Sequence, residues 1–195
     1  MPVYLKDIHE FEKLEHFESV LIVPCRFCPA ASLAVRNNEP YLSFFRDHLQ
    51  TAAYERYIET MKSELEKRGV KTDVFRSRLP HQFVVCMWTS RRRKKQIKQA
   101  KNYDALVVLG CEAAAQTILD SCEASSFHVV QGMRNEGIMS ILPRFQFPDR
   151  ITLQLNSITP LFHQKQGPDA WMRFDLEKDS ANSMYSIFNA RRNLQ

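Results

Sequence analysis

The sequence predicts an α/β fold in which helices cover both faces of an open, mostly parallel sheet, with an antiparallel edge hairpin near the C-terminus. Two short apolar runs, 19–24 and 105–109, are rich in β-branched residues and indicate strands buried on both faces. The second run leads through Gly110 and Cys111 directly into a helix-favouring segment, 112–120. This strand-turn-helix unit is typical of parallel sheets, so we expect right-handed crossovers.

A helical arm is predicted before the first strand, over residues 1–18. Apolar residues recur there every three positions, which is the spacing of an apolar stripe on a short helix. They are Ile8, Phe11, Leu14 and Phe17. The composition changes sharply at Ser19, so we place the start of the main domain, 19–163, at that residue.

A long helix is expected between Pro40 and Arg68, with a possible break near Thr51. Its apolar residues recur at steps of three and four, and Gly69 stands where a helix C-cap would be. Residues 70–75 then alternate as a second strand would. The apolar segment 83–88 has no periodicity that decides its class.

The next predicted helix is strongly basic. Thr89 or Ser90 can cap it, and it runs to about Asn102. Another strand is expected at 127–130, after the helix-favouring segment.

The C-terminal part of the main domain is predicted to contain a hairpin. Two apolar segments, 138–145 and 150–155, flank the turn signal at 147–149, Phe-Pro-Asp. Beyond them, residues 164–195 are polar and weakly periodic, and we expect a tail that packs only partly.

Composition excludes several classes of function. The chain has 195 residues, of which 44% are hydrophobic and 25% charged, so it can bury a sizeable core. With 5 Gly against 9 Pro it offers no glycine-rich phosphate loop, and no stretch approaches the roughly 18 apolar residues of a membrane span. The first residues carry acids and a Pro rather than a basic patch followed by an apolar run. We therefore expect no signal peptide and a cytoplasmic location.

The net charge of +5 is unevenly distributed, because residues 91–95 form one block of five cations. Such a block can bind nucleic acid or an acidic partner, or can simply be a solvated helix face. We do not expect a nucleic-acid partner, because only one block exists, aromatic residues are not interleaved with it and no nucleic-acid-binding motif is present.

Four of the five cysteines are predicted to approach one edge of the sheet. Cys25 and Cys28 follow the first strand and Cys111 follows the strand 105–109, and parallel strands end at the same edge. Cys86 lies in a connection that must also pass over that edge. The resulting pattern, C-x2-C-x57-C-x24-C, offers four soft ligands for a 4Fe-4S cluster or a tetrahedral zinc site. Pro29, after the second cysteine, mildly favours iron and sulfur.

The spacing leaves alternatives open. Cys86 and Cys111 can be buried apolar thiols, with Cys25 and Cys28 a dithiol redox pair. A dithiol motif normally opens a helix in a thioredoxin-like fold, however, and here two further cysteines arrive at the same edge.

Three further residues near this pattern have more than one possible role. Cys122 has no partner in sequence and is predicted to be a core thiol, whereas His81 can replace a cysteine ligand. Trp88 is either ordinary core packing or, with Met87 and the cations beside Cys86, part of a docking patch.

Three features together carry a resemblance to a known family: Pro-Cys-Arg-Phe-Cys at 24–28, Cys86 before a basic helix, and the segment 103–117, YDALVVLGCEAAAQT. Over roughly 19–162 the chain resembles the methylenetetrahydrofolate reductase C-terminal domain family, best known from the small MetV-type subunit of two-subunit reductases. The resemblance implies a Rossmann-like iron-sulfur module with Cys25, Cys28, Cys86 and Cys111 as cluster ligands. It also implies docking on a larger flavoprotein reductase subunit or a multi-subunit redox complex.

The sequence departs from that family in two places. Glu112 stands where the family usually has Gly, and no cysteine follows Cys122, so a second cluster within this chain is not expected. The acid nearest the proposed site is Glu112, with Gln116 and Asn135 as polar neighbours, which does not make an acid-base pair. We therefore predict a non-catalytic electron-transfer subunit. A C-x-x-C thiol-disulfide oxidoreductase and a structural zinc-binding interaction module are the alternatives.

Overall fold

The first structural unit of the chain spans Met1–Phe162. The computed structural model describes most of the first unit, and the predicted tail 164–195 lies outside the described residues. None of the described helices is long and apolar enough to cross a membrane. The described residues are 2–7, 14–43, 51–76, 84–122 and 127–160.

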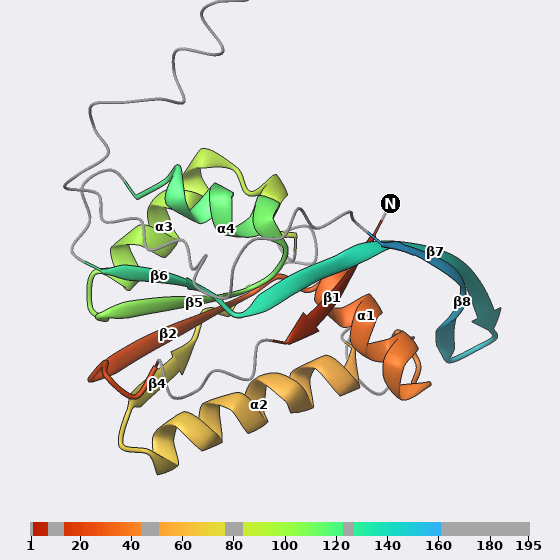
Figure 1. Cartoon of the computed structure of the whole chain (residues 1–195), viewed down its shortest axis with the longest axis horizontal. Helices are drawn as coiled ribbons and strands as arrows, with labels where there is room; N and C mark the ends of the chain where they lie inside the picture. The colour runs from red at the N-terminus through yellow and green to blue at the C-terminus, as the bar shows by residue number, and fades with distance from the viewer. Residues whose placement is uncertain (1, 8–13, 44–50, 77–83, 123–126, 161–195) are drawn as a thin grey trace, which may run out of the picture. The chain divides into compact units, whose positions relative to one another are not determined.

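A four-stranded parallel sheet forms the centre of the first unit, with the strand order β4-β2-β5-β6 (Figure 1). β2 (Ser19–Pro24) pairs in parallel with β4 (Lys71–Val74) and with β5 (Ala105–Leu109), and β5 pairs in parallel with β6 (His128–Gln131). All five residues of β5 are buried, as the apolar run predicted. Strands that are buried on both faces consist almost entirely of apolar residues, as β2 and β5 do.

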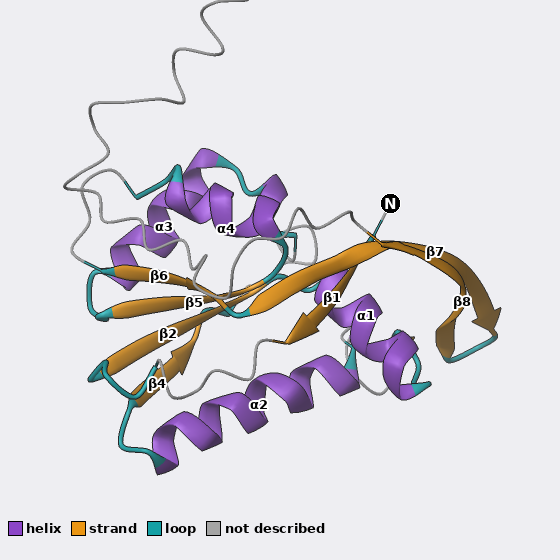
Figure 2. Cartoon of the chain, viewed as in Figure 1, coloured by secondary structure: helices purple, strands orange, loops and turns teal. Residues whose placement is uncertain are grey.

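Helices cover both faces of this sheet, which confirms the predicted α/β architecture. α1 (Cys28–Asn37) and α2 (Ala52–Lys67) lie on one face, and α3 (Ser90–Ala100) and α4 (Glu112–Leu119) lie on the other (Figure 2). α1 is absent from the elements predicted above. Its residues include three alanines and a proline in its first turn, so no clear apolar stripe marks it.

The predicted helix from Pro40 is wrong in its first part. β3 (Leu42–Ser43) is a short strand paired with β8 (Arg150–Pro160), and the Tyr41 N–H donates to the carbonyl of Ile151. The helix begins only after Thr51, and residues 44–50 lie outside the described part of the chain. Backbone pairing with the hairpin thus overrides the local periodicity. After the C-terminal end of α2, Gly69 has a φ of 85°, as expected for a residue that follows a helix.

A second, antiparallel sheet has the order β1-β7-β8-β3. It contains the predicted hairpin, formed by β7 (Met133–Gln146) and β8 (Arg150–Pro160). The hairpin is longer than predicted, and it belongs to this second sheet rather than to the edge of the parallel one. In Figure 1 its distal part curves away from the parallel sheet.

The N-terminal segment is a strand where the sequence predicted a helical arm. β1 (Val3–Asp7) pairs with β7, and the open edge of that long strand supplies backbone partners that a short helix would lack. Of the predicted apolar stripe, Ile8 and Phe11 lie outside the described residues, and Leu14 and Phe17 lie in a turn rather than a helix.

The distal hairpin has one apolar face. Directly opposed residues share a face, and beyond the bulge at Ser140/Ile141 the pairs alternate between apolar and largely polar. The apolar pairs are Ile141 with Leu155, Pro143 with Leu153 and Phe145 with Ile151, and the other pairs are Leu142 with Gln154, Arg144 with Thr152 and Gln146 with Arg150.

Candidate functional site: a cysteine cluster at the sheet edge

Cys25 and Cys111 leave the parallel sheet at the same edge, as the strand order requires. Cys25 follows β2 and its N–H donates to the carbonyl of Leu109, 2.9 Å away, at the end of β5. Gly110 lies between the two cysteine segments. A Cβ atom there would lie 3.2 Å from the Cβ of Cys25 and 2.7 Å from that of Ala114, so only glycine permits this approach.

Cys28 comes to the same place from the start of α1. Its thiol lies near that of Cys111, so that each of the two thiols shifts the pKa of the other. The second cysteine of the C-x-x-C motif therefore opens a helix that the sequence analysis did not predict. Cys111 is buried and Cys28 is half-buried.

Cys86 lies on the 3-10 turn η3 (Val85–Met87), and the unassigned segment 83–88 is therefore neither a strand nor a long helix in its described part. The backbone N–H of Val85 counteracts the rise in the pKa of Cys25, so η3 lies beside the cysteine cluster. Cys86 is exposed, but its thiol is close enough to Cys111 for their charges to interact. All four predicted cysteines thus lie at one edge of the sheet.

The site favours a thiolate at Cys111. The hydrogen bond from Cys28 lowers the pKa of Cys111 to about 6, against the effect of burial, and the N–H groups of Ala114 and Ala113 at the start of α4 add to this. The same hydrogen bond, together with burial, raises the pKa of Cys28. Burial raises the pKa of Cys25 to about 11 and also raises the pKa of Cys86.

Within the described residues, no group of three or more His, Cys, Asp or Glu side chains is arranged to hold a metal ion. The four cysteines are neighbours, but they do not form a closed ligand cage. The metal site therefore stays a prediction. The donor types and the N–H groups directed at the sulfurs do suit a thiolate-bound group, because hydrogen bonds to sulfur accompany such sites.

Three other candidates from the sequence have surroundings or partners of their own, and a fourth lies outside the described residues. Cys122 is buried in the core, as predicted, and His81 lies outside the described residues. Gln116 donates to Asp120 on its own helix, and Asn135 accepts from the N–H of Gly137 on its own strand.

Two tyrosines near the cluster were missed, because their spacing marked them only as apolar helix positions. The hydroxyl of the buried Tyr54 donates to the carbonyl of Leu109, 3.2 Å away. Burial raises the pKa of Tyr54, and burial together with the nearby Cys28 and Cys25 raises that of Tyr41 to about 12. Both hydroxyls therefore remain protonated beside the cysteines.

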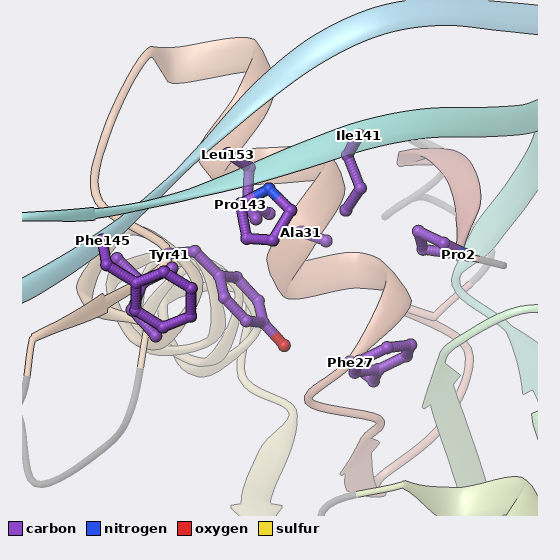
Figure 3. Close-up of a pocket in the computed structure, with 9 residues that line it drawn as sticks. Pro2, Phe27, Ala31, Tyr41, Ile141, Pro143, Phe145 and Leu153 are labelled. Carbon is purple, nitrogen blue, oxygen red and sulfur yellow. The ribbon is translucent and has the colours of Figure 1, made fainter.

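The two residues between Cys25 and Cys28 differ in their surroundings, because Arg26 forms an ion pair and Phe27 is partly exposed. Arg26 pairs with Glu55 of α2 at 2.7 Å, and its side chain is largely buried. Phe27 is 42% exposed and lines an apolar cavity of about 190 Å³. Figure 3 shows Ala31 and Tyr41 in the same cavity, with Pro143, Phe145 and Leu153 from the hairpin forming a wall.

The comparisons with known proteins add nothing to this geometry. No protein-family model, no curated protein and no solved structure matches the chain. The resemblance drawn from the sequence is accordingly a prediction, and the functional argument depends on the residues themselves.

Proposed function

We propose that the chain is an accessory electron-transfer subunit that holds a 4Fe-4S cluster on Cys25, Cys28, Cys86 and Cys111. The observation that supports this most is the convergence of four thiols, from three separate segments, on one edge of a parallel sheet. Open α/β sheets bind their ligands at this edge. When bound, the cluster would supply one-electron transfer.

The surroundings of the thiols suit a group that carries positive metal charge. Three of the four thiols have raised pKa values, so they would remain protonated without such charge. A metal would favour their deprotonated form, as it does for any coordinating thiol. The N–H groups of Val85, Ala113 and Ala114 would hydrogen-bond the sulfurs and help to set the reduction potential.

The proposed partner is a larger flavoprotein reductase subunit or a multi-subunit redox complex. The apolar cavity beside Phe27 and the exposed hairpin aromatics support a protein partner, since Phe145 is 72% and Phe147 is 97% exposed. Exposed apolar clusters of this kind are typical of interaction surfaces. The family resemblance supports the same partner class.

The test is anaerobic purification followed by iron, sulfide and zinc analysis and a visible spectrum. We expect iron and sulfide in equal amounts and a broad absorption near ~400 nm that bleaches with dithionite. Stoichiometric zinc with no visible absorption would contradict the cluster and support a structural zinc-binding interaction module.

A second candidate is a thiol-disulfide oxidoreductase, and the hydrogen bond between Cys28 and Cys111 favours it. The Cys111 thiolate would attack a substrate disulfide and release one substrate thiol. Cys28 would then attack the mixed disulfide, which releases the second thiol and leaves a Cys28–Cys111 disulfide. The structure thus favours this pair over Cys25 with Cys28.

Insulin reduction with dithiothreitol as electron source separates the two candidates. The oxidoreductase requires that Cys28→Ser and Cys111→Ser abolish turnover while Cys86→Ser retains it. The cluster proposal expects no turnover above that of Cys111→Ser, and loss of iron from all three variants.

A further inference from the structure

We propose that the outer edge of β8 pairs with the same edge of a second copy of the chain, so that the two hairpins form one continuous antiparallel sheet. The segment that pairs is residues 152–156, which we call the β8 edge. The twofold axis of the dimer passes beside Gln154. This interface goes beyond the proposed function and requires no bound metal.

The outer side of β8 is open over most of its length. In the order β1-β7-β8-β3, β8 has β7 on one side and, on the other, only β3, which pairs with Arg150 and Ile151. The Tyr41 N–H donates to the carbonyl of Ile151 from this outer side. Because backbone groups alternate between the two sides of a strand, Leu153 and Leu155 also direct their N–H and C=O groups outward. Among the described strands, none pairs with these groups, and such a row is a template for another strand.

The outer side of β7 differs, because its sequence discourages further pairing. β1 covers β7 as far as Ile138, and the distal part then contains Pro143 and Arg144. Pro143 is opposite Leu153, so its missing N–H is a group that would point outward. Prolines and charged residues are common means of keeping edge strands from pairing. Residues 151–159 of β8 include neither, so the hairpin is protected at one edge only.

The charge distribution favours a second copy as the partner. The net charge of +5 makes two copies of the chain repel each other overall. Residues 151–160 carry no charge, however, and Arg150 forms an ion pair with Asp149 at 3.5 Å. Two copies can therefore meet along this strand without opposed like charges, which would destabilise the pairing. A charged partner strand would find no complementary group there, and twofold dimers are the commonest assemblies.

The register of β8 is self-complementary about Gln154. Antiparallel pairing about this residue places Leu153 opposite Leu155 of the second copy, and both leucines direct their backbone groups outward. Both side chains lie on the apolar face of the hairpin, so that face continues from one copy to the next. Leu155 is 37% exposed and Leu153 lines the apolar cavity, so the pairing covers apolar surface. On the other face Gln154 opposes itself, and two neutral amides can hydrogen-bond.

The length of the β8 edge is limited at both ends. β3 occupies the outer side at Ile151. Asn156 has no partner on β7, because Ile141 pairs with Leu155 and Ser140 with Ser157, and such a bulge bends the strand. So short an edge buries less than the about 1,200–2,000 Å² of a stable interface, and we therefore expect a dimer that forms only at high protein concentration.

The first test is sedimentation velocity of the purified full-length chain at low and high concentration. We expect monomers at low concentration and dimers at high concentration. Gln154→Lys places two like charges opposite each other at the twofold axis and should raise the dimer dissociation constant about 10-fold. The control Gln146→Lys makes the same change in charge at another exposed residue on the same face of the hairpin, outside the β8 edge. It should leave the dissociation constant unchanged.

The second test measures the register by cross-linking. Gln154 faces Gln154 of the second copy as a pair without mutual backbone bonds, for which the Cα atoms lie about 4.5 Å apart, within disulfide range. Diamide, which accepts the two electrons and two protons of disulfide formation, should therefore convert Gln154→Cys into a covalent dimer on a non-reducing gel. Gln146→Cys, also at an exposed position, should give only the cross-linking of the unmodified chain.

Several results would overturn the proposal. A chain that is monomeric at every concentration has no such interface, and equal dissociation constants for the two lysine variants would place the contact elsewhere. Equal cross-linking of the two cysteine variants would exclude the register. If the chain stays monomeric but binds a synthetic peptide of residues 151–160, and Gln154→Lys weakens that binding, the edge takes a strand from another protein instead. Iron and zinc contents test the proposed function separately, because association is the only readout here.

Discussion

In the parallel sheet, apolar side chains stand on both faces of β2 and β5, and helices cover both faces. In the distal β7–β8 hairpin, one face carries six apolar side chains and part of that surface stays exposed. The first region completes its packing within the chain. The second leaves apolar surface that another molecule can cover. The cysteine cluster lies beside both regions, since Cys25 and Cys111 follow strands of the first and Phe27 lines the cavity below the second.

Substitutions beside the parallel sheet and substitutions in the hairpin should differ most in their effect on metal content. Cys111→Ser and Cys25→Ser are each expected to remove essentially all bound metal, because a four-thiolate site needs every ligand. Phe145→Ala, on the apolar face of the hairpin, should leave the metal content unchanged. Iron and zinc are measured by mass spectrometry on anaerobically purified protein.

Cys122→Ser is the control for this series, because Cys122 is buried in the core without a ligand role. If Cys122→Ser removed the metal while Cys86→Ser retained it, the ligand assignment would be wrong. Loss of metal from Phe145→Ala would show that the hairpin and the cluster are not independent.

Truncation of one leucine in each region should show that the parallel sheet contributes more to stability than the hairpin. Leu106 of β5 is 0% exposed, and Leu106→Ala is expected to lower the free energy of unfolding by about 2–5 kcal/mol through lost burial and a cavity. Leu155 of the hairpin is 37% exposed, and Leu155→Ala should cost less than about 1 kcal/mol. Urea denaturation followed by circular dichroism measures both. Equal costs would mean that the hairpin face is already covered in the isolated chain.

Two glycine substitutions compare the cysteine edge of the parallel sheet with the hairpin at positions where the backbone is closely approached by other atoms. Gly110→Ala would place a Cβ atom against Ala114 and Cys25, and Gly137→Ala would place one 2.5 Å from the carbonyl oxygen of Thr159. Each is expected to cost about 1–3 kcal/mol through overpacking. Only Gly110→Ala should also lower metal content, because it displaces the cysteine segments. If both variants lowered metal content equally, the cluster would depend on the register of the hairpin.

Much of the parallel sheet was predictable, and much of the second sheet was not. The apolar runs at 19–24 and 105–109 are buried by their own helices, so local pattern and final environment agree. β1 and β3 depend on backbone pairing with β7 and β8, far away in sequence, and no local pattern records that pairing. For the same reason the edge position of the cysteines was predictable from strand order, but the contact between Cys28 and Cys111 was not. That contact depends on α1, an alanine-rich helix without a clear apolar stripe.

The last expected effect is a pH dependence that belongs to the cluster and not to the hairpin. In chelator-treated protein the pKa of Cys111 is lowered to about 6 from its ordinary value of 9.0, so the folded chain binds fewer protons than the unfolded chain between these values. The stability from the Cys111 thiolate is therefore fully present above pH 9.0 and is lost as the pH falls through about 6. Cys25, Cys28 and Cys86 have raised pKa values in the folded chain. They change the stability only at pH values above about 9, because below that pH their thiols are protonated in both the folded and the unfolded chain. The urea midpoint should rise between pH 6 and pH 9, and Cys111→Ser should remove that slope while Phe145→Ala retains it. A slope that survives in Cys111→Ser would assign the titration to another group and would remove the argument for a thiolate at the start of α4.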